Sequence, residues 1–224
     1  MQRPPDLKVV ADPAKAVGEL LAAQAVAGGS IVLTGGSTPG EAYAHAAKRA
    51  PDWSAATVWW GDERCVPPED ERSNYRLAKE TLLDRLAVPP FAVHRIRGEL
   101  APQAAAESYA EELADTQLDL LLLGLGSDGH MASLFPGSPQ LAVADRRVTW
   151  GPPGLEPLVD RVTLTLPAIQ SARRIVFLTS GEGKADAVAR AFGGEPGEAA
   201  PASLARLAPV VIEVFLDGAA ASKL

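Results

Sequence analysis

The chain has 224 residues, of which 47% are hydrophobic and 22% are charged, with 21 Lys and Arg against 28 Asp and Glu. This composition excludes a disordered chain and predicts an ordinary buried core. The formal net charge of −7 repels polyanions, which argues against non-specific binding to nucleic acid or to an anionic membrane. An anionic ligand must therefore be held by a local cluster of cations.

Cysteine and histidine are scarce. The single Cys65 excludes an intramolecular disulfide, and His45 and His94 have no partners at metal-ligand spacing, so neither a metal nor a redox cofactor is expected. The opening MQRPPDLKVV lacks the apolar run of a signal peptide, and no stretch approaches the roughly eighteen apolar residues of a membrane span. We expect a cytoplasmic protein with one domain over residues 1–224.

Short apolar runs alternate with Ala-rich helical stretches, which is typical of an α/β fold whose parallel sheet is covered by helices on both faces. The runs LDLLLLGLG and RIVFLTSG are almost continuously apolar, as central strands buried on both faces must be. The predicted strands are residues 9–10, 31–34, 57–60, 93–96, 118–123, 162–165, 175–179 and 210–216. The predicted helices are residues 13–27, 41–50, 74–86, 101–114 and 184–192.

The ligand crevice of an open parallel sheet lies outside the carboxyl ends of the strands, and four loops rich in glycine and polar residues follow predicted strands. The first, in IVLTGGSTPGEAYAHAAK, runs through Gly35, Gly36, Ser37, Thr38 and Pro39 into a helix. Its backbone, hydroxyls and helix N-terminus could hold an anion, although the Lys-Ser/Thr pair of a P-loop is missing. Taken alone, the loop fits a helix cap by Ser37 or Thr38 better than a ligand site.

The second loop, in TVWWGDERCVPPEDERSNY, carries Asp62, Glu63 and Arg64. The planar fork of Arg64 could clamp a phosphate or carboxylate, and Asp62 could fix a polar group. The alternative is a solvated loop ion pair, with Ser73 capping the next helix, and an isolated DER triplet favours that alternative. Cys65 has no neighbouring base and is interpreted as an idle thiol.

The third loop, in LDLLLLGLGSDGHMASLFPGSP, matches G-x-G-x-x-G over residues 124–129. Pro136 and the Gly-Ser-Pro after it would break the helix that a dinucleotide site requires there. Asp128 and His130 stand two residues apart at the mouth of a central strand. Imidazole titrates near neutrality and can take a proton from water and return it to a leaving oxygen, so His130 is a candidate catalytic base.

The fourth region, RVTLTLPAIQSARRIVFLTSGEGKADAV, contains Arg161 at the start of a strand and Lys184 at the start of a helix. A lysine in the first helical turn is mildly unfavourable to the helix dipole, which suggests a role such as phosphate binding. Either residue could instead be a plain surface cation. Together with Arg64 they could form the cationic cluster that an anionic ligand needs.

The four loops, in this order, resemble the 6-phosphogluconolactonase family. The matching stretches, which span residues 31–220, are LTGGSTPG, WWGDERCVPPEDERSNY, LDLLLLGLGSDGHMASLFPGSP, DRVTLTLPAIQSARRIVFLTSGEGKADAV and PVVIEVFLDGAA. The resemblance implies a Rossmann-like three-layer α/β/α sandwich with a mostly parallel sheet, and no metal or nucleotide cofactor. It also implies hydrolysis of 6-phospho-D-glucono-1,5-lactone to 6-phosphogluconate in the pentose phosphate pathway. Separately from the resemblance, we expect a monomer or weak homo-oligomer.

The site residues follow from the loops and the resemblance together. His130, oriented by Asp128, is expected to act as general base toward a water that attacks C1. A covalent route through Ser133 is disfavoured because G-x-S-x-G is absent. The oxyanion could be stabilised by the backbone of residues 124–129 or by Arg64. The residues expected to bind the substrate are Gly36, Ser37, Thr38, Asp62, Arg64, Arg161 and Lys184, with Arg161 preferred over Arg146 and Arg147 through the resemblance alone.

Two other functions stay open. Glucosamine-6-phosphate deaminase/isomerase is similar in fold and in its G-x-D-G-H loop, but that loop looks like D-G-H-x-A-F-N-E-P, with a Glu where this chain has Phe135. The missing carboxylate weakens a ring-opening reaction. A non-catalytic sugar-phosphate sensor would keep the cations and could dispense with His130.

Overall fold

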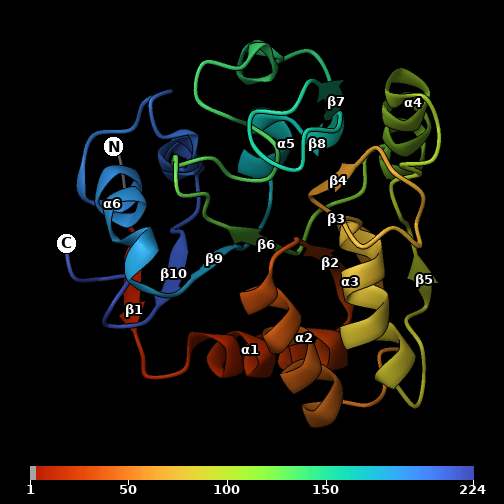
Figure 1. The fold of residues 1–224 in the computed structure, drawn as a ribbon. Helices are drawn as coiled ribbons and strands as arrows, with labels where there is room; N and C mark the ends of the chain where they lie inside the picture. Colours follow the sequence, from red (N-terminus) through yellow and green to blue (C-terminus); the bar gives the residue numbers. More distant parts are fainter. Residues whose placement is uncertain (1–3) are drawn as a thin grey trace.

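The computed structural model describes residues 4–224, and at its centre lies a seven-stranded sheet in the order β1-β10-β9-β6-β2-β3-β5 (Figure 1). Every strand pair in this sheet is parallel, as the alternation of apolar runs and helical stretches predicts. The strands are β1 Asp6–Val9, β2 Gly29–Leu33, β3 Ala56–Trp60, β5 Ala92–Val93, β6 Leu120–Gly124, β9 Ile175–Thr179 and β10 Glu213–Leu216.

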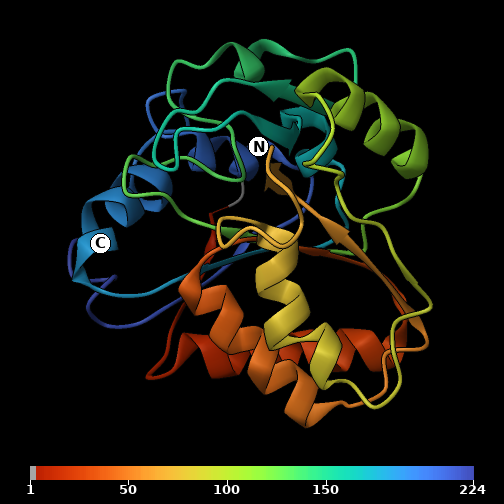
Figure 2. The ribbon, with the colours of Figure 1, turned by 45° about the vertical axis from the view of Figure 1, so that its right-hand side comes forward.

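Helices cover both faces of this sheet. Figure 2 shows α1, α2 and α3 together on one side, and α4 with a second, smaller sheet on the other. The helices are α1 Pro13–Ala27, α2 Ser37–Arg49, α3 Asn74–Thr81, α4 Pro102–Leu113, α5 Leu166–Gln170 and α6 Ala185–Val188. The three-layer α/β/α architecture implied by the resemblance is therefore confirmed.

The starts of α1 and α3 follow ordinary capping chemistry. The Asp12 carboxylate accepts a hydrogen bond from the Lys15 N–H at the start of α1, and Pro13 occupies the first turn, where its missing N–H costs little. Ser73 caps α3 as expected, because its hydroxyl accepts from the Arg76 N–H. In both cases the sequence signal and the structure agree.

The smaller sheet contradicts part of the sequence prediction. It is antiparallel, in the order β4-β8-β7, and consists of β4 Asp62–Arg64, β7 Val148–Gly151 and β8 Arg161–Leu164. The prediction treated residues 62–64 as a loop and counted residues 162–165 among the strands of one sheet. Because β8 is buried along its whole length, its composition is that of a central parallel strand. Because β4 has only three residues and follows β3 after Gly61, it resembles a loop.

Several element boundaries also differ from the predictions. The second helix begins at Ser37, not at residue 41, and the helix predicted over 74–86 ends at Thr81 and continues as the 3-10 turn Leu83–Arg85. The helix predicted over 184–192 divides into the 3-10 turn Glu182–Lys184, α6 and the π-helical turn Ala189–Gly193. The short α5 and the 3-10 turns Pro139–Ala142 and Pro201–Leu207 were not predicted.

Two buried tyrosines fix the carboxyl ends of neighbouring central strands. The Tyr43 hydroxyl donates to the Thr34 carbonyl and accepts from the Thr34 N–H, and Tyr109 does the same with the backbone of Trp60. Burial raises the pKa of both phenols, so both stay protonated donors at neutral pH. These contacts satisfy backbone groups at the point where the sheet ladder ends, and so hold the loops that follow.

No helix within residues 4–224 is both long and apolar enough to cross a membrane.

Candidate active site

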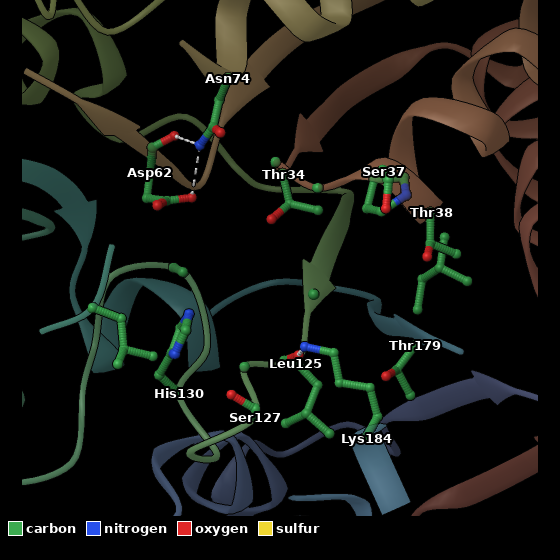
Figure 3. Close-up of a pocket in the computed structure, with 18 of the residues that line it drawn as sticks. Thr34, Ser37, Thr38, Asp62, Asn74, Leu125, Ser127, His130, Thr179 and Lys184 are labelled. Atoms are coloured by element: carbon green, nitrogen blue, oxygen red, sulfur yellow. Dashed lines mark hydrogen bonds between the residues drawn. The ribbon is translucent and has the colours of Figure 1, made fainter. Parts of the chain in front are cut away.

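A cavity of about 290 Å³ opens at the carboxyl ends of β2, β6 and β9, beside the smaller sheet. Figure 3 shows Asp62 and Asn74 on one side of it, with Thr38 and Lys184 on the other. Its position agrees with the rule that ligands of open α/β sheets bind outside the carboxyl ends of the strands. Of the residues expected at a site, Gly36, Ser37, Thr38, Asp62, Arg64, His130 and Lys184 line this cavity.

His130 lies in the loop after β6 and is held by Asp128. One carboxylate oxygen of Asp128 lies 2.6 Å from His130 Nδ1 and 3.0 Å from the His130 backbone nitrogen. Burial opposes ionisation of Asp128, but these hydrogen bonds outweigh it and hold the pKa of the carboxyl below its usual range. An ionised carboxylate only accepts hydrogen bonds, so Nδ1 carries the ring proton and Nε2 is left with a free lone pair.

The loop packs closely around the imidazole. A Cβ on Gly126 would overlap the His130 ring, so only glycine fits there. On another side Phe135 packs against the ring, with centroids 4.6 Å apart. The imidazole is therefore confined by contacts on both sides as well as by Asp128.

Asp62 is 5% exposed, and hydrogen bonds from the loop after β6 and from the start of α3 fix it. Ser133 Oγ donates to one carboxylate oxygen at 2.7 Å, and Asn74 Nδ2 donates to the other at 3.2 Å and to the Asp62 carbonyl at 2.9 Å. The cavity thus has a rigid acceptor group. The sequence predictions missed Asn74, although the Ser-Asn pair that begins a helix shortly after GDER could have pointed to it.

The solvated ion pair suggested for the DER triplet is wrong. The Glu63 carboxylate is buried and accepts four hydrogen bonds, from the N–H groups of Arg64, Asn74 and Tyr75 and from the Ser73 hydroxyl. Burial raises the pKa of Glu63, and the four hydrogen bonds oppose that rise. This carboxylate joins β4 to the start of α3, and thereby fixes two residues of the cavity wall.

Two of the three expected cations reach the cavity. Lys184 ends the 3-10 turn before α6, and its ammonium donates to the Leu125 carbonyl at 2.7 Å. Burial lowers the pKa of Lys184, while the charge of Asp128 works in the other direction. Arg64 donates from Nη1 to the Arg72 carbonyl, and its buried Nε has no partner within residues 4–224.

The assignment of Arg161 to the substrate needs correction, because its side chain is directed elsewhere. It is 4% exposed, lies outside the cavity lining, and donates to the carbonyls of Leu155, Pro157 and Val159. A buried guanidinium needs such partners to offset its desolvation. Arg161 therefore fastens the segment over 155–159, from which Leu155 reaches the cavity wall.

The capping explanation for the Gly-Gly-Ser-Thr-Pro loop is also wrong. Gly36, at φ 112°, is the N-cap of α2, and within the described residues no side chain caps this helix. The Thr38 hydroxyl instead lies 3.1 Å from Ser180 Oγ, which joins the loops after β2 and β9. The first turn of α2 borders the cavity with its unpaired N–H groups and positive dipole end, an arrangement suited to an anion.

The fold and the site define a class: an α/β protein with an imidazole base, two cations and a rigid carboxylate at the strand ends, suited to a small anionic molecule that carries hydroxyls. A family model described as glucosamine-6-phosphate isomerases/6-phosphogluconolactonase matches residues 8–212, and the chain belongs to this family.

Relatives with assigned names agree with this membership. The chain is 39% identical to a 6-phosphogluconolactonase of Streptomyces coelicolor, with 100% of this chain and 93% of that protein covered. It is also 39% identical to a 6-phosphogluconolactonase of Mycobacterium tuberculosis, with 88% and 87% covered.

Solved structures show the same fold. The 6-phosphogluconolactonase of Trypanosoma brucei has a TM-score of 0.83 at 30% identity, with 100% of both chains covered. A monomeric glucosamine-6-phosphate deaminase has a TM-score of 0.84 at 20% identity, with 99% of this chain and 100% of that chain covered. At that identity the second likeness concerns the fold alone.

Proposed function

We propose that the protein hydrolyses 6-phospho-D-glucono-1,5-lactone to 6-phosphogluconate, the second step of the oxidative pentose phosphate pathway. The observation that carries this proposal is that His130, with its Nδ1 proton on Asp128, lines the same cavity as Arg64 and Lys184. The names of the relatives and the family membership support it.

In the proposed reaction His130 transfers one proton in two steps, first as a general base and then as a general acid. His130 Nε2 takes a proton from a water molecule as its oxygen attacks the lactone carbonyl at C1. The imidazolium, stabilised by Asp128, then gives the proton to the ring oxygen as the C1–O bond breaks. Proton transfer of this kind typically accelerates a reaction by roughly a hundred- to ten-thousandfold.

We propose that the remaining cavity residues position the substrate. Lys184, Arg64 and the start of α2, with Gly36, Ser37 and Thr38, bind the 6-phosphate, since these groups combine positive charge with hydrogen-bond donors. Asp62 accepts from a sugar hydroxyl. Ser133 is not needed as a nucleophile, because its hydroxyl is committed to Asp62 and lies behind the cavity lining.

Ring opening of an amino sugar is less well supported. The position at which the deaminase-like loop carries a Glu is occupied by Phe135, an apolar ring packed on His130. Among the described residues that line the cavity Asp62 is the only carboxylate, and none takes the place of that Glu beside the base. A sensor without catalysis would not need an imidazole polarised by a half-buried carboxylate.

The test is a pair of assays on the purified protein. Freshly prepared 6-phosphogluconolactone should release protons faster than its spontaneous hydrolysis, and glucosamine 6-phosphate should release no ammonia. Ammonia release without lactonase activity would establish the deaminase instead. Binding without turnover of either compound would establish the sensor. The cytoplasmic location and the monomeric or weakly oligomeric state expected from the sequence stay predictions.

A further inference from the structure

Asn74 lies in the cavity wall, and its place at the start of α3 does not explain its side chain. It is 2% exposed and is the first residue of α3, where the Glu63 carboxylate fixes its N–H at 2.8 Å. Its side chain nevertheless lines the cavity next to Asp62. Ser73 supplies the side-chain cap of α3, so the start of the helix does not require the Asn74 amide.

The orientation of the amide is determined by its neighbours. Nδ2 donates to the carbonyl and to a carboxylate oxygen of Asp62, which uses both of its hydrogens. A flipped amide would direct its oxygen at those two acceptors, so the observed assignment is the stable one. Figure 3 shows the amide oxygen turned away from Asp62.

This oxygen has no hydrogen-bond partner within residues 4–224, and it is not one of the fully enclosed unpartnered atoms such as Trp60 Nε1. It lies beside Gly35, where an added Cβ would overlap it. Gly35 does not have a positive φ, unlike Gly36. Space for the Asn74 amide, rather than backbone conformation, therefore requires glycine at position 35.

We propose that Asn74 Oδ1 accepts a hydrogen bond from one ring hydroxyl of the substrate, and so selects hydroxylated sugar lactones over deoxy lactones. This inference rests on the proposed function. An amide oxygen only accepts, which suits a hydroxyl and repels a phosphate. Asp62 is also an acceptor, so this side of the cavity recognises hydroxyls while Lys184 and α2 serve the phosphate.

The proposal is tested by pairing Asn74→Ala with the 2-, 3- and 4-deoxy analogues of the lactone. On the parent substrate we expect Asn74→Ala to lower kcat/KM by about tenfold to a hundredfold, as for a lost hydrogen bond that leaves a buried group unpaired. On one deoxy analogue the kcat/KM of the variant should match that of the wild type within about threefold, because this analogue lacks the hydroxyl that donates to Asn74 Oδ1. An equal penalty on the parent and on all three analogues would overturn the proposal.

Ser133→Ala is the matched control, because it removes the other donor to Asp62 and leaves Asn74 in place. Ser133→Ala should lower kcat/KM by a similar factor on the parent lactone and on the analogue that lacks the hydroxyl bound by Asn74. If Ser133→Ala shows the same coupling to that hydroxyl as Asn74→Ala, then Asp62 makes the contact and the proposal is overturned. Asn74→Ser, which keeps a polar residue at the start of α3, serves the same comparison should the alanine variant fail to fold.

Failure of the proposed function gives a different result. If the wild type does not hydrolyse the parent lactone, titration calorimetry with 6-phosphogluconate still tests the contact. Weaker binding by Asn74→Ala than by wild type would support it. Equal binding would overturn the inference about Asn74, and absence of binding to the wild type would overturn both proposals.

Discussion

The cavity is built by two regions that differ in construction. The rim of the seven-stranded sheet contributes glycine-rich loops after β2, β6 and β9, which present backbone groups, His130 and Lys184. The three-stranded sheet contributes Asp62 and Arg64, and the start of α3 contributes Asn74; buried hydrogen bonds fix the side chains of Asp62 and Asn74. In the proposed reaction the rim supplies the base, Lys184 and the start of α2, while the smaller sheet and α3 supply Arg64 for the phosphate and Asp62 and Asn74 for the hydroxyls.

The difference follows from the chemistry that each region performs. A base must accept and release a proton, so its Nε2 must stay unpaired, and within residues 4–224 the His130 ring is hydrogen-bonded at Nδ1 and not at Nε2. An orienting group works best when its geometry cannot relax, and Asp62 is held by three hydrogen bonds. Substitution of the base should therefore affect kcat, substitution of a phosphate-binding residue of the rim should affect KM, and substitutions near the smaller sheet should affect selectivity and stability.

His130→Asn should have the largest effect. The amide cannot take a proton from water, so kcat should fall by roughly a hundred- to ten-thousandfold while KM changes little. Steady-state kinetics with fresh lactone, corrected for spontaneous hydrolysis, measure both constants. Unchanged turnover in this variant would show that His130 is not the base, and would overturn the division of roles between the rim and the smaller sheet.

Lys184→Ala and Arg161→Ala should separate a cation that binds substrate from one that holds structure. Lys184→Ala should raise KM by about tenfold to a hundredfold, because it removes a positive charge from the phosphate cradle. Arg161→Ala should leave KM within a few-fold of wild type, but lower the free energy of unfolding by about 1 to 3 kcal/mol, because three carbonyls lose their donor. Kinetics and urea unfolding measure the two effects. A large rise in KM for Arg161→Ala would place its guanidinium on the substrate after all.

Gly35→Ala tests the point where the two regions touch. The added Cβ would overlap the Asn74 amide, so the amide must move and the hydrogen bonds to Asp62 must distort. We expect kcat/KM to fall by about tenfold, as for the loss of one good hydrogen bond. Gly183→Ala is the control, because a Cβ there meets no atom within 4 Å. Equal activities of the two variants would show that the Asn74 amide can move away from residue 35 without loss of activity.

The sequence predicted the two regions unequally. Runs such as LDLLLLGLG are long and apolar enough to identify buried strands, and the loops after them contain His130 and Lys184. The smaller sheet has strands of three or four residues, which carry almost no periodic signal. The direction of the Arg161 side chain and the place of Asn74 depend on that sheet. They could not be derived from composition, because they result from tertiary contacts.

The Cys65 thiol tests a property of the smaller sheet on which catalysis does not depend. Cys65 directly follows β4, and its N–H donates to the Asp160 carbonyl. Burial, reinforced by the charges of Asp160 and Glu63, raises the pKa of its thiol from 9.0 to about 11. Only the thiolate reacts with iodoacetamide, so alkylation of the folded protein at pH 8 should be roughly a hundredfold slower than alkylation of the unfolded chain. The ratio is measured by mass spectrometry of timed samples with and without urea. If the folded thiol reacts as fast as the unfolded one, then the end of β4 opens readily. The smaller sheet would then be too mobile to orient a ligand.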